Sequence, residues 1–141
     1  MSYEEKNAWV FGTVAVVAYA AYCVVILARA DGMPLADVPY AWPMLVTILA
    51  AILANIVLMI ILSIVTNDRG QKDERDKEIG RRGDHIGQAF VVIGAVAALI
   101  MAMLELDYFW IANVIYLCFV LSAVTSSAAK VVAYRRGFQG W

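Results

Sequence analysis

The chain has 141 residues, of which 63% are hydrophobic and 16% are charged. Soluble domains carry about 45–50% apolar residues, so this composition excludes an ordinary soluble domain and favours a membrane protein. The formal net charge of −1 conceals a very uneven distribution of charge along the chain.

Four long apolar runs predict four transmembrane helices. They occupy about residues 8–28, 44–66, 86–104 and 109–129 and contain no Asp, Glu, Lys or Arg. At about 1.5 Å rise per residue, such runs reach roughly 28–34 Å, enough to cross a hydrocarbon core of about 30 Å. Backbone groups in lipid must be paired within the segment, which favours helix. We therefore expect one all-α domain over residues 1–141, a membrane four-helix bundle of two antiparallel hairpins.

The distribution of Lys and Arg predicts the orientation. Arg29 lies on one side of the four runs, and the other ten Lys and Arg lie on the opposite side. Cytoplasmic segments carry such an excess, so we expect both termini in the cytoplasm and the protein in a bacterial inner membrane. The leader before the first run is acidic on balance, and the run exceeds the usual length of about 7–15 residues for a signal peptide. We expect this run to be retained.

Residues 67–85 are predicted to form a charged cytoplasmic loop with six acids and six bases. Glycines at 70, 80 and 83 are expected to limit any helix here to about two to three turns over residues 71–79, with Asp84 as the N-cap of the third span. The loop is either a self-neutralising solvated linker or a docking surface. In the second interpretation the residues that contact a partner are Asp73, Glu74, Arg75, Asp76, Arg81, Arg82 and Asp84.

Polar side chains within the spans also have two interpretations. They hydrogen-bond one helix to another, or they line a small path for a substrate. The intramembrane residues singled out are Asn55, Asn113, Tyr116 and Tyr19. Because the spans hold no Asp, Glu, Lys or Arg, ion-coupled transport is disfavoured. Gly94 and Ala98 have a spacing that permits close helix approach, either within the chain or between two chains.

The sequence shows no pattern typical of a cofactor site or a catalytic site. Cys23 and Cys118 both lie within spans, and His85 is the single histidine. One histidine suffices neither for a haem held by two histidines nor for a zinc site. We expect no enzyme, no metal, no cofactor and no direct contact with nucleic acid. The tail at residues 130–141 combines bases with aromatics and is expected to anchor to membrane lipids.

Several short segments carry a resemblance to a known family: Asp73–Asp76, Arg81–Asp84, Phe109–Asn113, Tyr134–Gly137 and Glu4–Trp9. In these segments the chain resembles a largely uncharacterised family of small bacterial four-helix integral membrane proteins with a charged cytoplasmic loop. The resemblance covers most of the chain. Some members of that family are encoded beside small helix-turn-helix regulators, which implies a membrane partner that holds a regulator.

These observations predict a non-enzymatic membrane protein that binds or positions a partner through its charged loop. The partner is a cytosolic regulator or a larger membrane complex. One alternative is a small dimeric transporter, with the intramembrane polar residues along its path. A second alternative is an accessory subunit of a bioenergetic membrane complex. A protein partner or a homo-oligomer is expected in each case.

Overall fold

A computed structural model describes residues 3–34, 37–66 and 74–136 of the chain. It contains four helices: α1 (Tyr3–Arg29), α2 (Ala41–Thr66), α3 (Glu74–Met103) and α4 (Tyr108–Arg136). The described ranges contain no strand. Each helix is long and apolar enough to cross a membrane. The all-α class and the four membrane-length helices are therefore confirmed.

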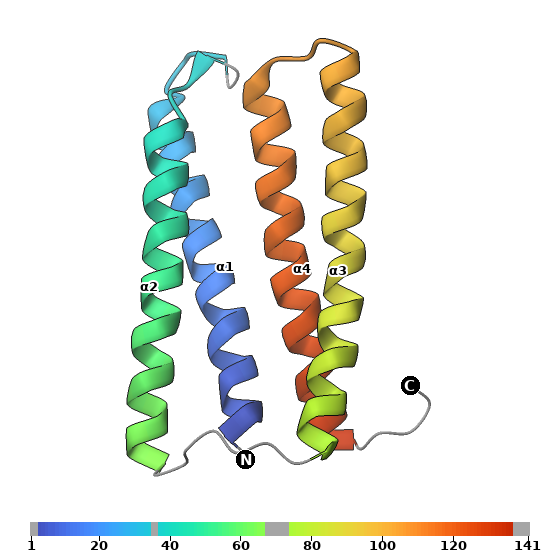
Figure 1. Cartoon of the computed structure of the whole chain (residues 1–141). Coiled ribbons are helices and arrows are strands. Elements are labelled where there is room, and N and C mark those ends of the chain that lie inside the picture. The colour runs from blue at the N-terminus through green and yellow to red at the C-terminus, as the bar shows by residue number, and fades with distance from the viewer. Residues whose placement is uncertain (1–2, 35–36, 67–73, 137–141) are drawn as a thin grey trace.

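The helices pack in the spatial order α2, α1, α4, α3, as Figure 1 shows. α3 packs on α4, α4 on α1, and α1 on α2, whereas α2 and α3 lie at the two outer positions. No residue in the most apolar 18-residue window of α2 is buried. In lipid such exposure is stable because lipid tails are as apolar as the side chains that contact them.

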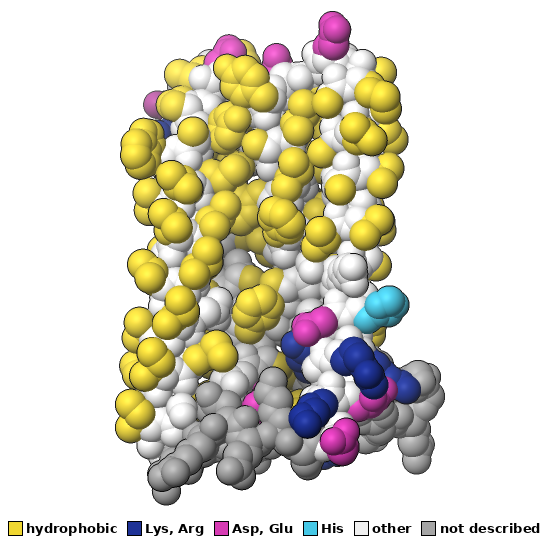
Figure 2. All heavy atoms as spheres, in the orientation of Figure 1, with side chains coloured by type: hydrophobic (Ala, Val, Ile, Leu, Met, Phe, Trp, Pro, Cys, Tyr) yellow, Lys and Arg dark blue, Asp and Glu magenta, His cyan; other side chains and the backbone are white. Residues whose placement is uncertain are grey.

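Charged and apolar side chains occupy different parts of the helices. Figure 2 shows hydrophobic side chains spread over the length of the helices, with most of the visible Lys and Arg gathered at one end. We call this the basic end; α1 and α3 begin there, and α2 and α4 end there. Arg29 lies at the opposite end, where its guanidinium donates to the carbonyl oxygen of Pro39 at 3.4 Å.

The entrance to α2 fits the sequence. Pro43 lies in the first turn of the helix, where proline is tolerated because a first-turn residue needs no backbone N–H for the helix. The N–H of Met44 donates to the carbonyl oxygen of Tyr40 at 2.9 Å and closes the first turn.

A tight turn joins α3 to α4. Glu105 has a φ of 58°, and its N–H donates to the carbonyl of Ala102 at 3.0 Å. The N–H of Leu106 donates to the carbonyl of Met101 at 3.1 Å. Together these bonds form the Schellman motif that ends many helices. The role of Glu105 in the fold is therefore to hold a left-handed backbone position.

The charged segment is helical further than the sequence predicts. α3 begins at Glu74 and continues without interruption to Met103. The expectation that Gly80 and Gly83 end a short helix is wrong, and Asp84 is not an N-cap because it lies inside α3. Tertiary packing explains the difference, since the loss of about 1 kcal/mol that glycine causes in a helix is offset by contact with α4. The part of the expected loop at residues 67–73 lies outside the described residues.

Glycines let α3 approach α4 closely. A Cβ atom added at Gly87 would lie 2.7 Å from the carbonyl oxygen of Ser122, and one added at Gly94 would lie 2.6 Å from the Cβ of Cys118. At Gly83 the added atom would lie 2.6 Å from the Cγ of Lys130. We call Gly83, Gly87 and Gly94 the glycine seam. In this structure the small-residue spacing at Gly94 is thus used between two helices of one chain.

We expect Gly87→Ala to lower the free energy of unfolding by about 1–3 kcal/mol, because the new methyl group meets a backbone oxygen that cannot rotate away. Gly80→Ala is the matched control, since nothing lies within 4 Å of an added Cβ there. That variant is expected to be neutral or stabilising by about 0.5–1 kcal/mol. Equilibrium unfolding in mixed micelles measures both, and equal stabilities for the two variants would contradict the glycine seam.

Candidate functional site

The first turn of α3 is fixed to the last turn of α4. The guanidinium of Arg75 donates to the carbonyl oxygens of Ala133 at 3.4 Å and Tyr134 at 3.3 Å. It also lies 5.4 Å from the centre of the Tyr134 ring. The last four carbonyls of a helix have no partner within the helix, and the helix dipole favours a cation there. Arg75 therefore caps α4.

Two carboxylates of α3 also bind α4. The hydroxyl of Tyr134 donates to Asp76 at 2.6 Å. The ammonium of Lys130 donates to Asp84 at 2.8 Å, and the hydroxyl of Ser126 donates to the same carboxylate oxygen at 3.3 Å. These contacts continue the helix pairing of the glycine seam into the charged segment.

The outer face of the same helix carries ion pairs within α3. Glu78 accepts hydrogen bonds from Arg82, at 2.8 Å, and from Arg81. These bonds hold the pKa of the Glu78 carboxyl below its ordinary value. The Oε1 of Glu74 lies 3.8 Å from the Nζ of Lys77. The i,i+4 spacing of Glu78 and Arg82 in the sequence predicts an ion pair on a helix, and that pair is present. The same spacing predicts a pair between Asp73 and Lys77, but Asp73 lies outside the described residues.

The residues predicted to contact a partner thus divide into two groups. Arg75, Asp76 and Asp84 bind α4, so their first role is to hold α3 in place. Glu74 and Arg81 are exposed, and Arg82 is half-buried. Asp73 lies outside the described residues. The sequence showed the density of charge but not which side of the helix each charge occupies.

α1 and α4 are joined by a partly buried ion pair. The guanidinium of Arg135 donates to the carboxylate of Glu5 at 2.9 Å, and it lies 5.6 Å from the centre of the Trp9 ring. Only 6% of Glu5 is exposed. A buried carboxylate needs such a partner, because leaving it unpaired is strongly destabilising.

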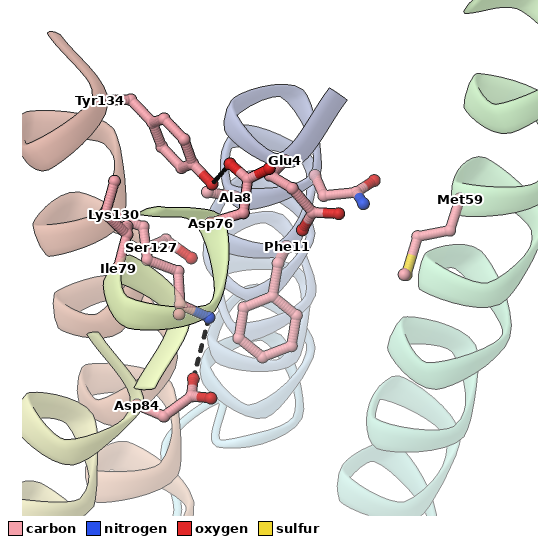
Figure 3. A pocket seen from close by; sticks show the side chains of 12 residues that line it. Glu4, Ala8, Phe11, Met59, Asp76, Ile79, Asp84, Ser127, Lys130 and Tyr134 are labelled. Carbon is pink, nitrogen blue, oxygen red and sulfur yellow. Dashed lines mark hydrogen bonds and ion pairs between the residues drawn. The ribbon is translucent and has the colours of Figure 1, made fainter. Parts of the chain in front are cut away.

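A cavity of about 480 Å³ opens at the basic end, between α1, α3 and α4 with one residue of α2. Figure 3 shows its lining side chains. The polar members are Glu4, Asn7, Asp76, Asp84, Ser127, Lys130 and Tyr134, and the others are Ala8, Phe11, Met59, Ile79 and Gly80. The sequence alone does not indicate this cavity, because its lining residues come from four helices that are distant along the chain.

Two lining residues hold buried polar atoms without a partner among the described residues: the Oγ of Ser127 and the Oδ1 of Asn7. Buried polar groups in proteins are nearly always hydrogen-bonded, to protein or to ordered water. Ser127 is only 5% exposed. These atoms are therefore the strongest local indication that the cavity holds an occupant with hydrogen-bonding groups.

A second polar cluster lies in the opposite half of the protein. The hydroxyl of Tyr22 donates to Asn113 at 2.6 Å, and the amide of Asn113 donates to the carbonyl of Phe109 at 2.7 Å. The hydroxyls of Tyr116 and Thr47 lie 2.9 Å apart. These bonds join α4 to α1 and to α2, which supports the interpretation of the intramembrane polar residues as links between helices.

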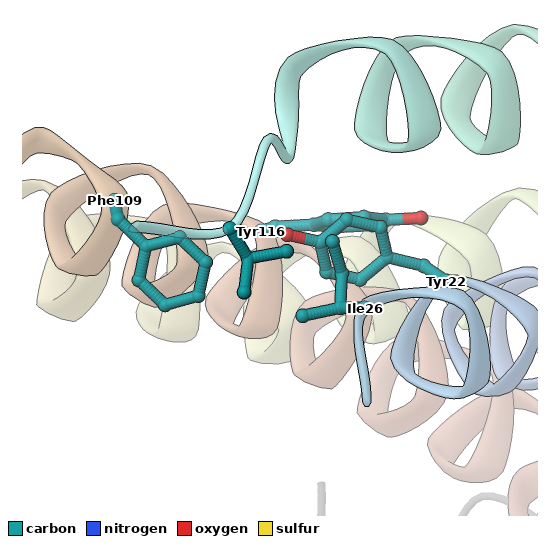
Figure 4. Packing of buried hydrophobic residues seen from close by; sticks show 5 residues of the cluster. Tyr22, Ile26, Phe109 and Tyr116 are labelled. Atoms are coloured by element: carbon teal, nitrogen blue, oxygen red, sulfur yellow. The ribbon is translucent and has the colours of Figure 1, made fainter. Parts of the chain in front are cut away.

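Aromatic rings fill the space around these hydrogen bonds. The rings of Tyr19 and Tyr116 lie 5.3 Å apart in a T-shaped contact, and those of Tyr22 and Tyr116 lie 5.0 Å apart. Figure 4 shows Tyr22, Ile26, Phe109 and Tyr116 of this cluster. Tyr22 is only 2% exposed. Three of the four residues singled out in the spans thus come together in a packed cluster.

Asn55 lies apart from that cluster on α2, and its Oδ1 is buried without a partner among the described residues. Thr47 and Tyr22 complete the cluster but were not among the residues singled out. Tyr22 shares a helical face with Tyr19 because the two are three residues apart, and this spacing was the available signal. The sequence around Thr47 carries no comparable signal, since a threonine in an apolar run usually bonds to its own helix.

We expect Tyr22→Phe to lower the free energy of unfolding by about 1 kcal/mol, because it leaves the Oδ1 of Asn113 without its donor in an apolar region. Tyr40→Phe is the matched control, since the Tyr40 ring packs on Phe109 at 5.5 Å and its hydroxyl makes no hydrogen bond to a described residue. SDS-induced unfolding in micelles measures both variants, and an equal effect would rule out the Tyr22–Asn113 bond as a stabilising link.

Comparison of the chain with protein-family models, with curated proteins and with solved structures finds no match. Within the described ranges, no three His, Cys, Asp or Glu side chains gather as a metal site requires. Any assignment of function to this chain therefore depends on its own geometry.

Proposed function

We propose that the protein is a multi-pass membrane protein of two antiparallel hairpins, with its basic end and both termini in the cytoplasm of a bacterial cell. The excess of Lys and Arg at one end supports this orientation, since cytoplasmic segments of membrane proteins carry that excess. The opposite end carries Arg29 with the acidic Asp31, Asp37, Glu105 and Asp107.

A fusion experiment tests the orientation in bacterial cells. Alkaline phosphatase fused to the C-terminus is expected to be inactive, and green fluorescent protein at the same site is expected to fluoresce. Alkaline phosphatase fused after Asp37 is the control and is expected to be active, because this position lies between α1 and α2. The reverse pattern of activities would refute the proposed orientation.

We further propose that the protein docks a cytosolic or membrane protein on the exposed face of the charged part of α3. We define this docking surface as Glu74, Lys77, Glu78 and Arg81. One observation carries the proposal: the charged segment is a continuous extension of α3 that Arg75, Asp76 and Asp84 hold against α4. A connection that only reverses the chain needs no such attachment. A preorganised surface binds a partner with a smaller loss of conformational entropy.

The chemistry of the docking surface favours a protein partner. It carries two acids and two bases, whereas surfaces that bind nucleic acid carry an excess of Lys and Arg. The side chains of Glu74, Lys77 and Arg81 are 94%, 61% and 76% exposed. Exposed ion pairs contribute only about 0–1 kcal/mol each, so these side chains can form new pairs with a partner at little cost to the fold.

Co-purification tests the docking surface. The full chain, tagged at its N-terminus and gently solubilised from native membranes, is expected to retain a stoichiometric protein partner. The triple variant Glu74→Gln, Lys77→Gln, Arg81→Gln is expected to lose at least about 80% of it, because three of the four charges of the docking surface are removed while the contacts to α4 stay intact.

The matched control is Arg29→Gln with Asp31→Asn, which removes exposed charges at the opposite end and is expected to leave the partner bound. A partner that stays with the triple variant would contradict the docking surface. A homo-oligomer with no second protein would instead favour the transport alternative, for which flux into liposomes is the measurement. Instability of the purified chain without a larger complex would favour the accessory-subunit alternative.

A further inference from the structure

A second hollow lies between α1 and α4, on a different face of α1 from the cavity at the basic end. The two hollows share only Ala8 and Ser127 among their lining residues. α1 and α4 approach closely at Gly12, where an added Cβ would lie 2.9 Å from the Cβ of Ser127. Beside this contact the helix surfaces leave a groove of about 470 Å³. We call it the α1–α4 groove.

The walls of the α1–α4 groove are mostly apolar. The apolar side chains come from both helices: Trp9, Val16 and Val17 of α1, and Val124, Val131 and Val132 of α4. Val17 is 61% exposed and Val132 is 47% exposed, so the groove is open to the side. From Ala8 to Val17 the lining of α1 extends over roughly 14 Å at about 1.5 Å rise per residue, about half of a hydrocarbon core of about 30 Å. The groove therefore has the polarity and the length that suit one acyl chain of a lipid in the leaflet at the basic end.

Arg135 spans the end of the groove. Its Nε donates to the carboxylate of Glu5 on α1 at 2.9 Å, and its guanidinium lies 5.6 Å from the centre of the Trp9 ring, which lines the groove. A guanidinium has five N–H donors. The other four make no hydrogen bond to a described residue. They are therefore available to an anion at this point, and a phosphate fits the fork of an arginine especially well.

Two further cations lie at the same end of the groove. Lys6 precedes Trp9 by three residues, and Arg136 follows Val132 by four. Residues at these spacings are neighbours on a helix surface, so each cation continues the groove side of its helix beyond the apolar wall. Neither side chain makes an ion pair with a described residue.

The charge at this end of the groove is positive after its ion pair is counted. Glu5 balances Arg135, and Glu4 lines the separate cavity on the other face of α1. Lys6 and Arg136 thus leave an excess of two positive charges where an acyl chain in the groove would place its headgroup. Such an excess attracts anionic lipid.

We propose that the α1–α4 groove binds one anionic phospholipid, with an acyl chain along the groove and the phosphate at Arg135, Lys6 and Arg136. The lipid anchoring expected of residues 130–141 thereby has a defined site. The proposal is independent of the docking surface, which lies on α3, and it holds whichever side of the membrane the basic end faces.

Lipid selectivity of the unmodified protein is the first test. The full chain in detergent micelles is titrated with dioleoyl phosphatidylglycerol or dioleoyl phosphatidylcholine, which share acyl chains but differ in net charge, and native mass spectrometry counts the bound lipids. We expect one phosphatidylglycerol to bind saturably and on the order of tenfold more tightly than phosphatidylcholine. Equal affinities for the two lipids, or the absence of saturable binding, would overturn the proposal.

A pair of charge variants locates the headgroup. Lys6→Gln with Arg136→Gln removes the excess charge, leaves the ion pair between α1 and α4 intact, and is expected to abolish most of the preference for phosphatidylglycerol. Lys77→Gln with Arg81→Gln is the matched control, because it removes the same charge at the same end from the outer face of α3. It is expected to keep the preference. Equal loss in both variants would mean diffuse attraction to the basic end and would refute the site.

A bulky side chain in the groove tests the place of the acyl chain. Ala128 is exposed and lines the groove, so Ala128→Phe is expected to weaken phosphatidylglycerol binding on the order of tenfold. Ala95→Phe, at an exposed alanine of α3, is the control and is expected to bind normally; circular dichroism verifies that both variants keep their helices. Unchanged binding in Ala128→Phe would overturn the proposal. A lipid-free homodimer that dissociates in Ala128→Phe would also overturn it and assign the groove to a second copy.

Discussion

The close approach of α3 to α4 along the glycine seam determines the position of most other features of this protein. In lipid, apolar side chains gain little by leaving the bilayer, so helices associate through close packing and hydrogen bonds. Gly87 and Gly94 remove the side chains that would otherwise hold the two backbones apart. The two helices then remain together beyond the apolar segments, where charged residues replace glycines as the contacts between them.

The charged part of α3 consequently has two faces with different roles. The inner face supplies a cap for α4 through Arg75 and two carboxylate contacts through Asp76 and Asp84. The outer face is solvated and carries local ion pairs. A helix held from one side leaves the other side as a fixed pattern of charge. The same attachment forms one wall of the cavity at the basic end, which Met59 of α2 lines from another side.

Sequence reasoning found the four spans because a run of some twenty apolar residues has few other stable structures. It failed at Gly80 and Gly83, where local propensity predicted a helix end. Propensity is a weak indicator when a helix packs on a neighbour. α3 packs on α4 at Gly83, where an added Cβ would lie 2.6 Å from the Cγ of Lys130. Polar groups in an apolar segment require partners, and for this reason the sequence points to Asn113, Tyr116 and Tyr19. In the structure these three residues lie in one packed cluster.

The sequence by itself determined the number of helices, their membrane length and the separation of charge toward one end, because these follow from hydropathy and charge along a single segment. Only the tertiary structure decided which glycines permit close contact, which charges face α4 and which face solvent, and that Glu4, Asn7, Asp76 and Ser127 line one cavity. These properties depend on the rotation of each helix about its axis and on its neighbours. Neither is encoded in the order of residues within one helix.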